Sequence, residues 1–154
     1  MTAVTEEKVK SGNRRLSREL VLKGLYQHFL SANSEKSIAN HLQEDALFAR
    51  ADKTYCNALL QGVLANMDGL HSQLSQFIDR KVEELSPVER AVLYIATYEL
   101  AFDATIPYRV VINEGIELAK KYGGVDGHKY VNGVLDKIAL QLRSDEVKKR
   151  STKA

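Results

Sequence analysis

The chain has 154 residues, 44% of them hydrophobic and 27% charged, which is the composition of an ordinary globular protein long enough to form its own core. Its single cysteine, Cys56, excludes an internal disulfide, and no run of about 20 apolar residues is present to cross a membrane. The first residues lack the apolar segment of a secretory signal, so we expect a cytoplasmic protein.

Positive charge is concentrated at the two ends of the sequence, although the net charge is only +2. Residues 1–18 and residues 143–154 each hold five basic and two acidic side chains, which leaves the part between them acidic. Basic ends on an acidic body are suited to a polyanion that binds at an edge. Charge alone does not separate this interpretation from a pair of solubilising tails.

The first half of the sequence predicts helices joined by short loops. Residues 1–12 are polar and lack periodicity, which indicates a disordered basic tail. From about residue 13 to residue 31, apolar residues cover two sides of the predicted helix, so we expect this helix to lie centrally. Weaker patterns predict a short helix within residues 32–50, a longer one over residues 53–71 and a short one ending near residue 78.

The second half has clearer start and stop signals. Ser86 and Glu89 predict a capping box around Pro87, which suits the first position of a helix. Another helix follows Pro107 and ends at two glycines, and Asp126 is the predicted N-cap of the last helix. No segment alternates like a strand. The sequence therefore predicts an all-α fold of six to seven helices in two packed three-helix units, residues 13–80 and 86–142, with a basic C-terminal tail at 143–154.

Three arginines, Arg14, Arg15 and Arg18, lie at the start of the first predicted helix. Arginine binds phosphate with two parallel hydrogen bonds and stacks on bases, so this cluster is suited to RNA. Tyr26 shares the face of Arg15 and is a further candidate for RNA binding. The alternative is a surface pair between Arg15 and Glu19 beside a half-exposed tyrosine ring.

A second polar cluster, Asp126, His128, Lys129 and Tyr130, lies at the start of the last predicted helix. The free N–H groups of a helix N-terminus can bind phosphate oxygens, and an aromatic ring there can stack on an unpaired base. The alternative is that Asp126 only caps the helix and Tyr130 is a half-buried core ring.

The sequence has no pattern typical of an enzyme. No Gly-rich phosphate loop follows a strand, and no set of His, Cys and carboxylate residues has the spacing of metal ligands. Cys56 has no evident activating neighbour, so it is interpreted as a small core residue. We therefore expect no catalytic residue, no cofactor and no metal.

Five stretches of the sequence resemble one known family, over roughly residues 14–142. They are VINEGIELAKKYG at 111–123, VDGHK at 125–129, YVNGVLDK at 130–137, RRLSRELVLKGLYQ at 14–27 and SPVERAVLYIATYELAF at 86–102. In this combination they resemble the NusB family of transcription antitermination factors. The resemblance implies contacts with boxA RNA through Arg14, Arg15 and Arg18 and at Asp126 and Tyr130. Relatives often have Phe in place of Tyr130.

The resemblance also implies a protein partner, the small-subunit ribosomal protein NusE. Its footprint is expected around Glu89, Tyr94, Tyr98 and Tyr108, although relatives often have Arg in place of Tyr94. The implied function is that of a non-enzymatic adaptor, which binds boxA-type RNA and NusE and loads onto RNA polymerase to suppress termination in ribosomal RNA operons. Family members occur as monomers and as homodimers. The alternative is a self-associating helical scaffold whose basic ends serve only solubility.

Overall fold

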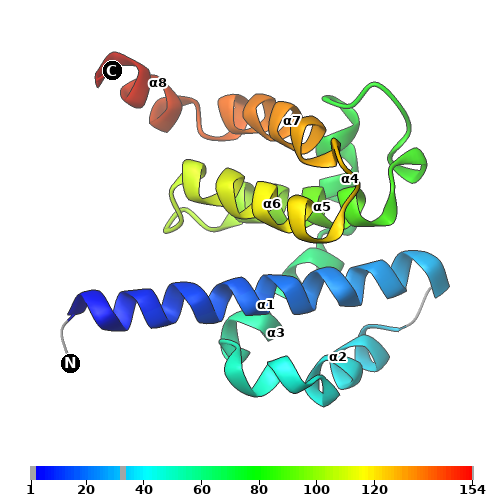
Figure 1. Cartoon of the computed structure of the whole chain (residues 1–154). Coiled ribbons are helices and arrows are strands. Elements are labelled where there is room, and N and C mark those ends of the chain that lie inside the picture. The colour runs from blue at the N-terminus through cyan, green and yellow to red at the C-terminus, as the bar shows by residue number, and fades with distance from the viewer. Residues whose placement is uncertain (1–2, 32–33, 154) are drawn as a thin grey trace. The chain divides into compact units, whose positions relative to one another are not determined.

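The computed structural model describes residues 3–31 and 34–153, and every regular element in that part of the chain is helical (Figure 1). The prediction of an all-α fold is confirmed, with one α-helix more than expected among the described residues. The elements in chain order are α1 (Ala3–Ser31), α2 (Glu35–Glu44), η1 (Ala46–Arg50), α3 (Lys53–Ala65), α4 (Met67–Ser75), η2 (Val82–Glu84), α5 (Pro87–Phe102), α6 (Tyr108–Tyr122), α7 (Gly127–Leu142) and α8 (Ser144–Lys153).

The chain divides into two compact units, the first ending at Ala65 and the second beginning at Asn66. This division lies earlier in the chain than the boundary near residues 80–86 that we predicted. The reason is that α4 packs against α5 and therefore belongs to the second unit. The helices α1, α2 and α3 form the first unit, and α4 to α8 form the second.

Helix α1 begins at Ala3 rather than near residue 13, so the prediction of disorder was wrong for residues 3–12. Residues 1 and 2 of that predicted tail lie outside the described residues. The segment holds two Glu and two Lys residues, which favour a helix even without an apolar face. The helix that carries the three arginines is therefore longer than its apolar pattern indicates.

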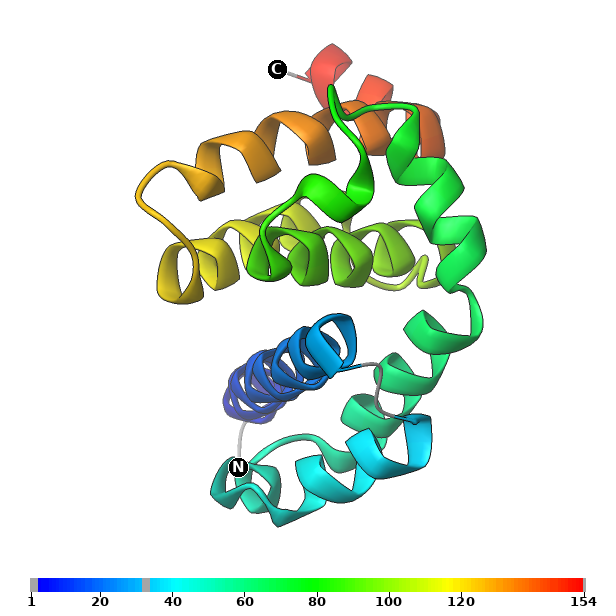
Figure 2. The same cartoon turned by 90° about the vertical axis from the view of Figure 1, so that its right-hand side faces the viewer.

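In the first unit, α1 contacts α2, η1 and α3 (Figures 1 and 2). Leu20, Val21 and Leu25 are fully buried, which agrees with the central position predicted for this helix. Helices α1 and α2 approach closely at Gly24, where a Cβ atom would lie 2.7 Å from the Cγ2 atom of Ile38. A larger residue at position 24 would push α2 away.

In the second unit, α5 forms the core, and α4, α6 and α7 pack around it (Figure 2). All residues from 91 to 97 are buried. The predicted start of α5 is confirmed, because the Ser86 Oγ accepts a hydrogen bond from the Glu89 N–H at 3.2 Å. Helix α6 ends where predicted, before Gly123, at which a Cβ atom would lie 2.6 Å from the Ala119 carbonyl oxygen.

Residues 144–153 of the predicted basic C-terminal tail form the helix α8, Arg143 directly precedes it, and Ala154 lies outside the described residues. Arg143 fixes its start. All five guanidinium N–H groups of Arg143 have acceptors: the carbonyl oxygens of Glu99, Leu100, Asp103 and Ile106, and the Oε2 atom of Glu146, at 2.8–3.2 Å.

Glu146 in turn binds the start of α6, because its Oε1 atom accepts a hydrogen bond from the Tyr108 N–H at 2.9 Å. Burial raises the pKa of Glu146, but the Tyr108 N–H and the Arg143 guanidinium lower it by more, so the net pKa is below the usual range. These contacts make residues 143–146 part of the second unit, which charge counting along the sequence could not reveal.

Candidate nucleic-acid interface

The first candidate site lies at the start of α3, where two α1 arginines meet one tyrosine. We call Arg14, Arg15, Arg18, Asp52 and Tyr55 the first-unit site. The Cζ atoms of Arg14 and Arg18 lie 4.5 and 5.4 Å from the centroid of the Tyr55 ring, within the range of cation–π attraction. The Nη2 atom of Arg18 donates to the Tyr55 hydroxyl at 3.5 Å.

The three arginines of the first-unit site differ in exposure. Arg15 is exposed and Arg14 is half-buried, but Arg18 is only 4% exposed. The prediction that Arg18 contacts RNA is therefore corrected, since a buried guanidinium presents no donors to a ligand. Its contact with Tyr55 makes it a residue that positions the ring.

Asp52 holds the first-unit site together. Its Oδ1 atom accepts a hydrogen bond from the Tyr55 N–H at 3.0 Å, as an N-cap of α3 does, and its Oδ2 atom lies 4.0 Å from the Arg14 Nε. The backbone N–H of Asp52 donates to the Asn13 carbonyl at 3.1 Å, and the Ser17 hydroxyl donates to the Asp52 carbonyl at 2.7 Å. Asp52 therefore ties α1 to α3 through its backbone as well as its carboxylate.

Tyr26 is 39% exposed and lies further along α1. It follows Arg15 by three helical turns, which separates the two Cα atoms by about 16 Å. One nucleotide could not contact both side chains, so Tyr26 does not belong to the first-unit site.

The second candidate site surrounds the start of α7. We call Asp79, Arg80, Asp126, His128, Lys129 and Tyr130 the second-unit site. The prediction that the Asp126 side chain caps α7 was wrong, because it makes no capping hydrogen bond. The Lys129 N–H that it would have accepted donates to the Asp126 carbonyl at 3.1 Å instead. The carboxylate is exposed and lies 3.4 Å from the Lys129 Nζ.

Tyr130 meets two residues of the loop between α4 and η2. Its hydroxyl donates to the Oδ1 atom of Asp79 at 3.2 Å, and the Cζ atom of Arg80 lies 4.8 Å from the ring centroid. Asp79 also accepts from the Nε and Nη2 atoms of Arg80, at 2.8 and 3.4 Å. His128, two positions before Tyr130 on α7, is half-buried. The site thus includes two residues, Asp79 and Arg80, that the sequence reasoning missed.

The charges of this group are well defined. The hydrogen bond from Arg80 is the main cause that holds the pKa of Asp79 below its usual range, so the carboxylate is ionised near neutral pH. Burial, followed by the hydrogen bond to Asp79, raises the pKa of Tyr130, so its hydroxyl keeps the proton that it donates. The ring, the guanidinium and the carboxylate are therefore arranged as a stacking surface with charged edges.

Glu89 belongs to the surroundings of the second-unit site as well as to the α5 cap. A Cβ atom on Gly127 would lie 2.8 Å from the Oε1 atom of Glu89, so the carboxylate lies directly against the first residue of α7. The partial positive charge of a helix N-terminus favours a carboxylate at this position. A Cβ atom at position 127 would displace this carboxylate, which is the end of a flexible side chain and can move.

The candidates for the protein partner differ in accessibility. Tyr94 is fully buried, so its predicted contact with a partner is corrected: the side chain belongs to the core, and burial raises the pKa of its hydroxyl. Tyr98 is half-buried, and its ring centroid lies 5.1 Å from that of Phe102, which is 58% exposed. Tyr108, also half-buried, is held at the start of α6 by Glu146.

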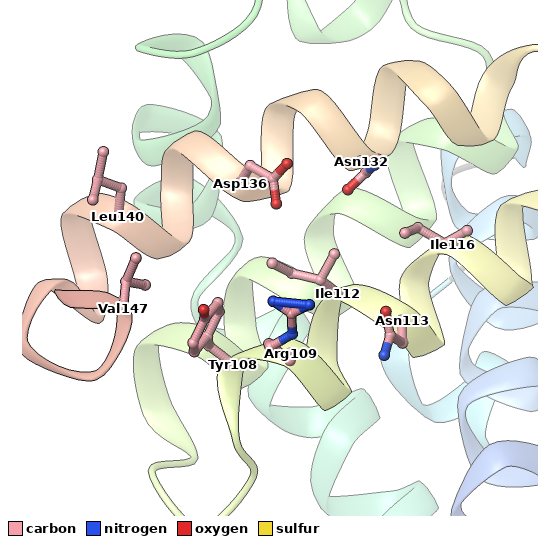
Figure 3. A pocket seen from close by; sticks show the side chains of 9 residues that line it. All are labelled: Tyr108, Arg109, Ile112, Asn113, Ile116, Asn132, Asp136, Leu140 and Val147. Carbon is pink, nitrogen blue, oxygen red and sulfur yellow. The ribbon is translucent and has the colours of Figure 1, made fainter. Parts of the chain in front are cut away.

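Tyr108 lies at one end of a groove with a volume of about 470 Å³ (Figure 3). Its walls are α6 and α7, and α8 closes one end. The lining side chains are Tyr108, Arg109, Ile112, Asn113, Ile116, Asn132, Asp136, Leu140 and Val147. Apolar, charged and amide side chains line the groove together, a mixture that is also found where protein surfaces meet.

The described residues give little support to a reactive thiol, a metal site or a membrane span. Cys56 is fully buried, as predicted, and burial, followed by the charge of Asp52, raises the pKa of its thiol to about 11, which makes it a poor nucleophile. Across residues 3–31 and 34–153, no group of three or more His, Cys, Asp or Glu side chains could hold a metal ion. None of the helices described there has the length and apolar character that a membrane span needs.

Two helical units, each with arginine stacked on tyrosine, define an all-α protein whose surface groups are suited to nucleic acid. The NusB family model matches residues 15–140, and the chain therefore belongs to the NusB family. It is 57% identical to the transcription antitermination protein NusB of Methylobacillus flagellatus, over 87% of each chain. It is 53% identical to the protein of that name from Cupriavidus pinatubonensis, over 96% of this chain and 89% of that protein.

A solved structure of NusB from T. maritima has a similar fold. It matches with a TM-score of 0.72 and 33% sequence identity, covering 88% of this chain and 96% of that one. The family resemblance that the five sequence stretches indicated is confirmed. Both of these relatives carry the name transcription antitermination protein.

Proposed function

We propose that this protein is an RNA-binding transcription antitermination factor of the cytoplasm, without enzymatic activity or a cofactor. The observation that carries the proposal is the family membership together with two arginine-on-tyrosine sites in one chain. The ligand is single-stranded RNA of the boxA type, because stacked guanidinium and phenol groups suit unpaired bases and arginine donors suit phosphate.

In this proposal, Arg14, Arg15 and Tyr26 contact RNA from α1, and Asp126, His128, Lys129 and Tyr130 contact it from α7. The exposure of Arg15, Asp126 and Lys129 supports these roles. Arg18 acts indirectly, by fixing Tyr55. Two weak sites on one chain give a combined affinity that neither site has alone, so both units contribute to binding.

The protein partner in this proposal is the ribosomal protein NusE, bound around Glu89, Tyr98 and Tyr108. The contact between the half-buried Tyr98 ring and the exposed Phe102 ring supports an aromatic contact, because such rings are enriched where protein surfaces meet. The assembled complex loads onto RNA polymerase and suppresses termination in ribosomal RNA operons.

The test is binding of a labelled boxA-type RNA and of a scrambled RNA of equal composition, at two salt concentrations, with and without NusE. Selective, salt-dependent binding that tightens with NusE is expected. Arg15→Ala should weaken binding and lower the salt slope by about 0.7, the value for one phosphate contact on single-stranded RNA. Arg50→Ala, at an exposed arginine of η1, is the matched control and should have no effect.

Equal, weak binding of both RNAs that NusE does not change would contradict the proposal. The chain would then be a self-associating helical scaffold, and its molar mass in solution, measured by light scattering over a range of concentrations, would reveal homodimers. Selective binding by a monomer and by a homodimer both agree with the proposal.

A further inference from the structure

Asp79, Arg80 and Tyr130 form one group within the second-unit site. Of these three residues, only Tyr130 lies in a sequence stretch that resembles the family. Tyr130 comes from α7, whereas Asp79 and Arg80 come from the loop before η2. All three side chains reach the surface: Asp79 is 71% exposed, Arg80 is 43% exposed and Tyr130 is half-buried. The loop and the helix thus meet through side chains that a ligand can reach.

Arg80 keeps unused binding capacity in this arrangement. Asp79 occupies the Nε and Nη2 groups, and Tyr130 supports one face of the guanidinium. Within the described part of the chain, the Nη1 group of Arg80 donates no hydrogen bond. A guanidinium that lies over a ring and keeps free donors can bind phosphate or stack on a base.

Asp79 limits what Arg80 can bind. Its charge lies 2.8 Å from the Arg80 Nε and would repel a phosphate that approaches the guanidinium from that side. Lys129 is similarly paired with Asp126 on the other part of the site. Both cations next to Tyr130 are therefore matched by carboxylates, so RNA that brings only its phosphates gains little there.

We infer that Arg80 is an RNA-contact residue of the second-unit site and that Asp79 determines its selectivity. Arg80 and Tyr130 form the stacking surface for one unpaired base, and the free Arg80 donors bind the adjoining phosphate. Asp79 holds the guanidinium on the ring and disfavours RNA that cannot place a base there. This inference rests on the proposed RNA-binding function and names residues of the same site.

A purely structural role is the competing explanation, in which Asp79 and Arg80 only hold the loop against α7. The two roles differ in what substitution changes. A structural role predicts that Arg80→Ala shifts the midpoint of urea unfolding and weakens binding of every RNA in proportion. The inferred role predicts unchanged unfolding and altered RNA binding, with opposite effects for Asp79 and Arg80.

The experiment measures binding of boxA-type and scrambled RNA to the full chain by fluorescence anisotropy at two salt concentrations. Arg80→Ala should weaken boxA binding about tenfold, the size expected for one charge-assisted contact, and lower the salt slope by about 0.7. Arg80→Lys should keep the slope but lose affinity, because an ammonium group does not stack as a planar guanidinium does.

Asp79→Asn should tighten binding of the scrambled RNA about threefold and lower the ratio of the two affinities, since a neutral amide no longer repels phosphate. The control is Arg109→Ala. Arg109 is an exposed arginine of the same unit, at the start of α6, which lies about 20 Å along that helix from the turn to α7. It should change neither affinity.

Wild-type affinity and slope in Arg80→Ala would overturn the contact role of Arg80, and unchanged selectivity in Asp79→Asn would overturn the role of Asp79. A wild-type protein that does not distinguish the two RNAs would contradict the proposed function instead. In that case, the salt slope of Arg80→Ala still reports whether Arg80 binds phosphate.

Discussion

The two units contain the same three residue types in nearly the same contact. In the first unit, Arg14 lies over Tyr55 at 4.5 Å, with Asp52 beside it. In the second unit, Arg80 lies over Tyr130 at 4.8 Å, with Asp79 beside it. The difference lies in the carboxylate: Asp52 is 28% exposed and caps a helix, whereas Asp79 is 71% exposed and lies in a loop.

This difference teaches that the supporting contacts, rather than the three side chains, decide what such a group does. Asp52 is fixed by its own backbone and by the α3 N-terminus, and Arg18 lies below the same ring. The first-unit site is therefore a rigid support that presents Arg14 and Arg15. Among the described residues, Asp79 and Arg80 make side-chain hydrogen bonds only with each other and with Tyr130, and both are exposed, so a ligand can rearrange the group at low cost.

The largest expected effect tests what makes an arginine rigid. We expect burial of the side chain to decide this, and not the unit in which the arginine lies. Arg143 lies in the second unit with Arg80, but its side chain is only 10% exposed and all five of its donors are used. Arg143→Ala should lower the free energy of unfolding by about 3 kcal/mol, because it leaves several backbone carbonyls unpaired. Urea denaturation measures this effect.

Arg143→Lys is the control, since it keeps the charge but cannot reach all of the acceptors; it should recover only part of the loss. Arg80→Ala should leave the urea midpoint unchanged. Equal midpoints for Arg143→Ala and Arg80→Ala would contradict burial as the deciding factor.

A smaller effect is expected at Arg18, the buried arginine of the first unit. Arg18→Ala should cost about 2 kcal/mol of unfolding free energy, because the partners of a buried guanidinium lose their hydrogen bonds. RNA affinity should fall only to the extent that folded protein is lost. Urea denaturation and RNA titration of one sample measure both quantities. Lost RNA binding with an unchanged urea midpoint would show direct contact and restore the role that the sequence predicted.

Asp52 provides the next effect in size. Asp52→Ala removes the N-cap of α3 and should cost about 1 kcal/mol, whereas Asp52→Asn keeps a capping oxygen and should cost much less. The matched change in the second unit, Asp79→Ala, removes no cap and should not shift thermal unfolding. Differential scanning calorimetry of the three variants measures this contrast. A shift for Asp79→Ala as large as that for Asp52→Ala would remove the distinction between the two sites.

The parts of the fold that the sequence predicted depend on local patterns. The apolar stripes of α1 and α5, the Ser86 cap and the glycines after α6 act within one helix or turn, so they can be recognised in the sequence. Helix α8 was missed because its position depends on Arg143, whose acceptors lie about 40 residues earlier in the chain.

For the candidate sites too, only the residues that cluster locally in the sequence could be predicted. The arginines of α1 and the start of α7 stand out as local clusters, but Tyr55, Asp79 and Arg80 do not. They join the sites through contacts between distant segments, such as that between Tyr130 and Asp79. The exposure of single side chains could not be predicted from the sequence either. Arg15 and Arg18 are three positions apart, yet Arg15 is exposed and Arg18 is buried.

The smallest expected effect concerns pH and the exposed carboxylate. A lowered pKa in the folded protein means that Asp79 stays ionised above the usual aspartate value of about 3.9 and loses its charge only as the pH falls through the lower value. The selectivity for boxA-type over scrambled RNA should therefore stay constant from about pH 4 to about pH 8.

Fluorescence anisotropy in a His128→Gln background measures this, since imidazoles in general change charge within that range. Asp79→Asn in the same background gives the selectivity expected without the charge. A fall in selectivity towards the Asp79→Asn value as the pH drops from about 5 to about 4 would mean that Arg80 does not lower the pKa of the carboxylate. The second-unit group would then be even less constrained than its contacts indicate.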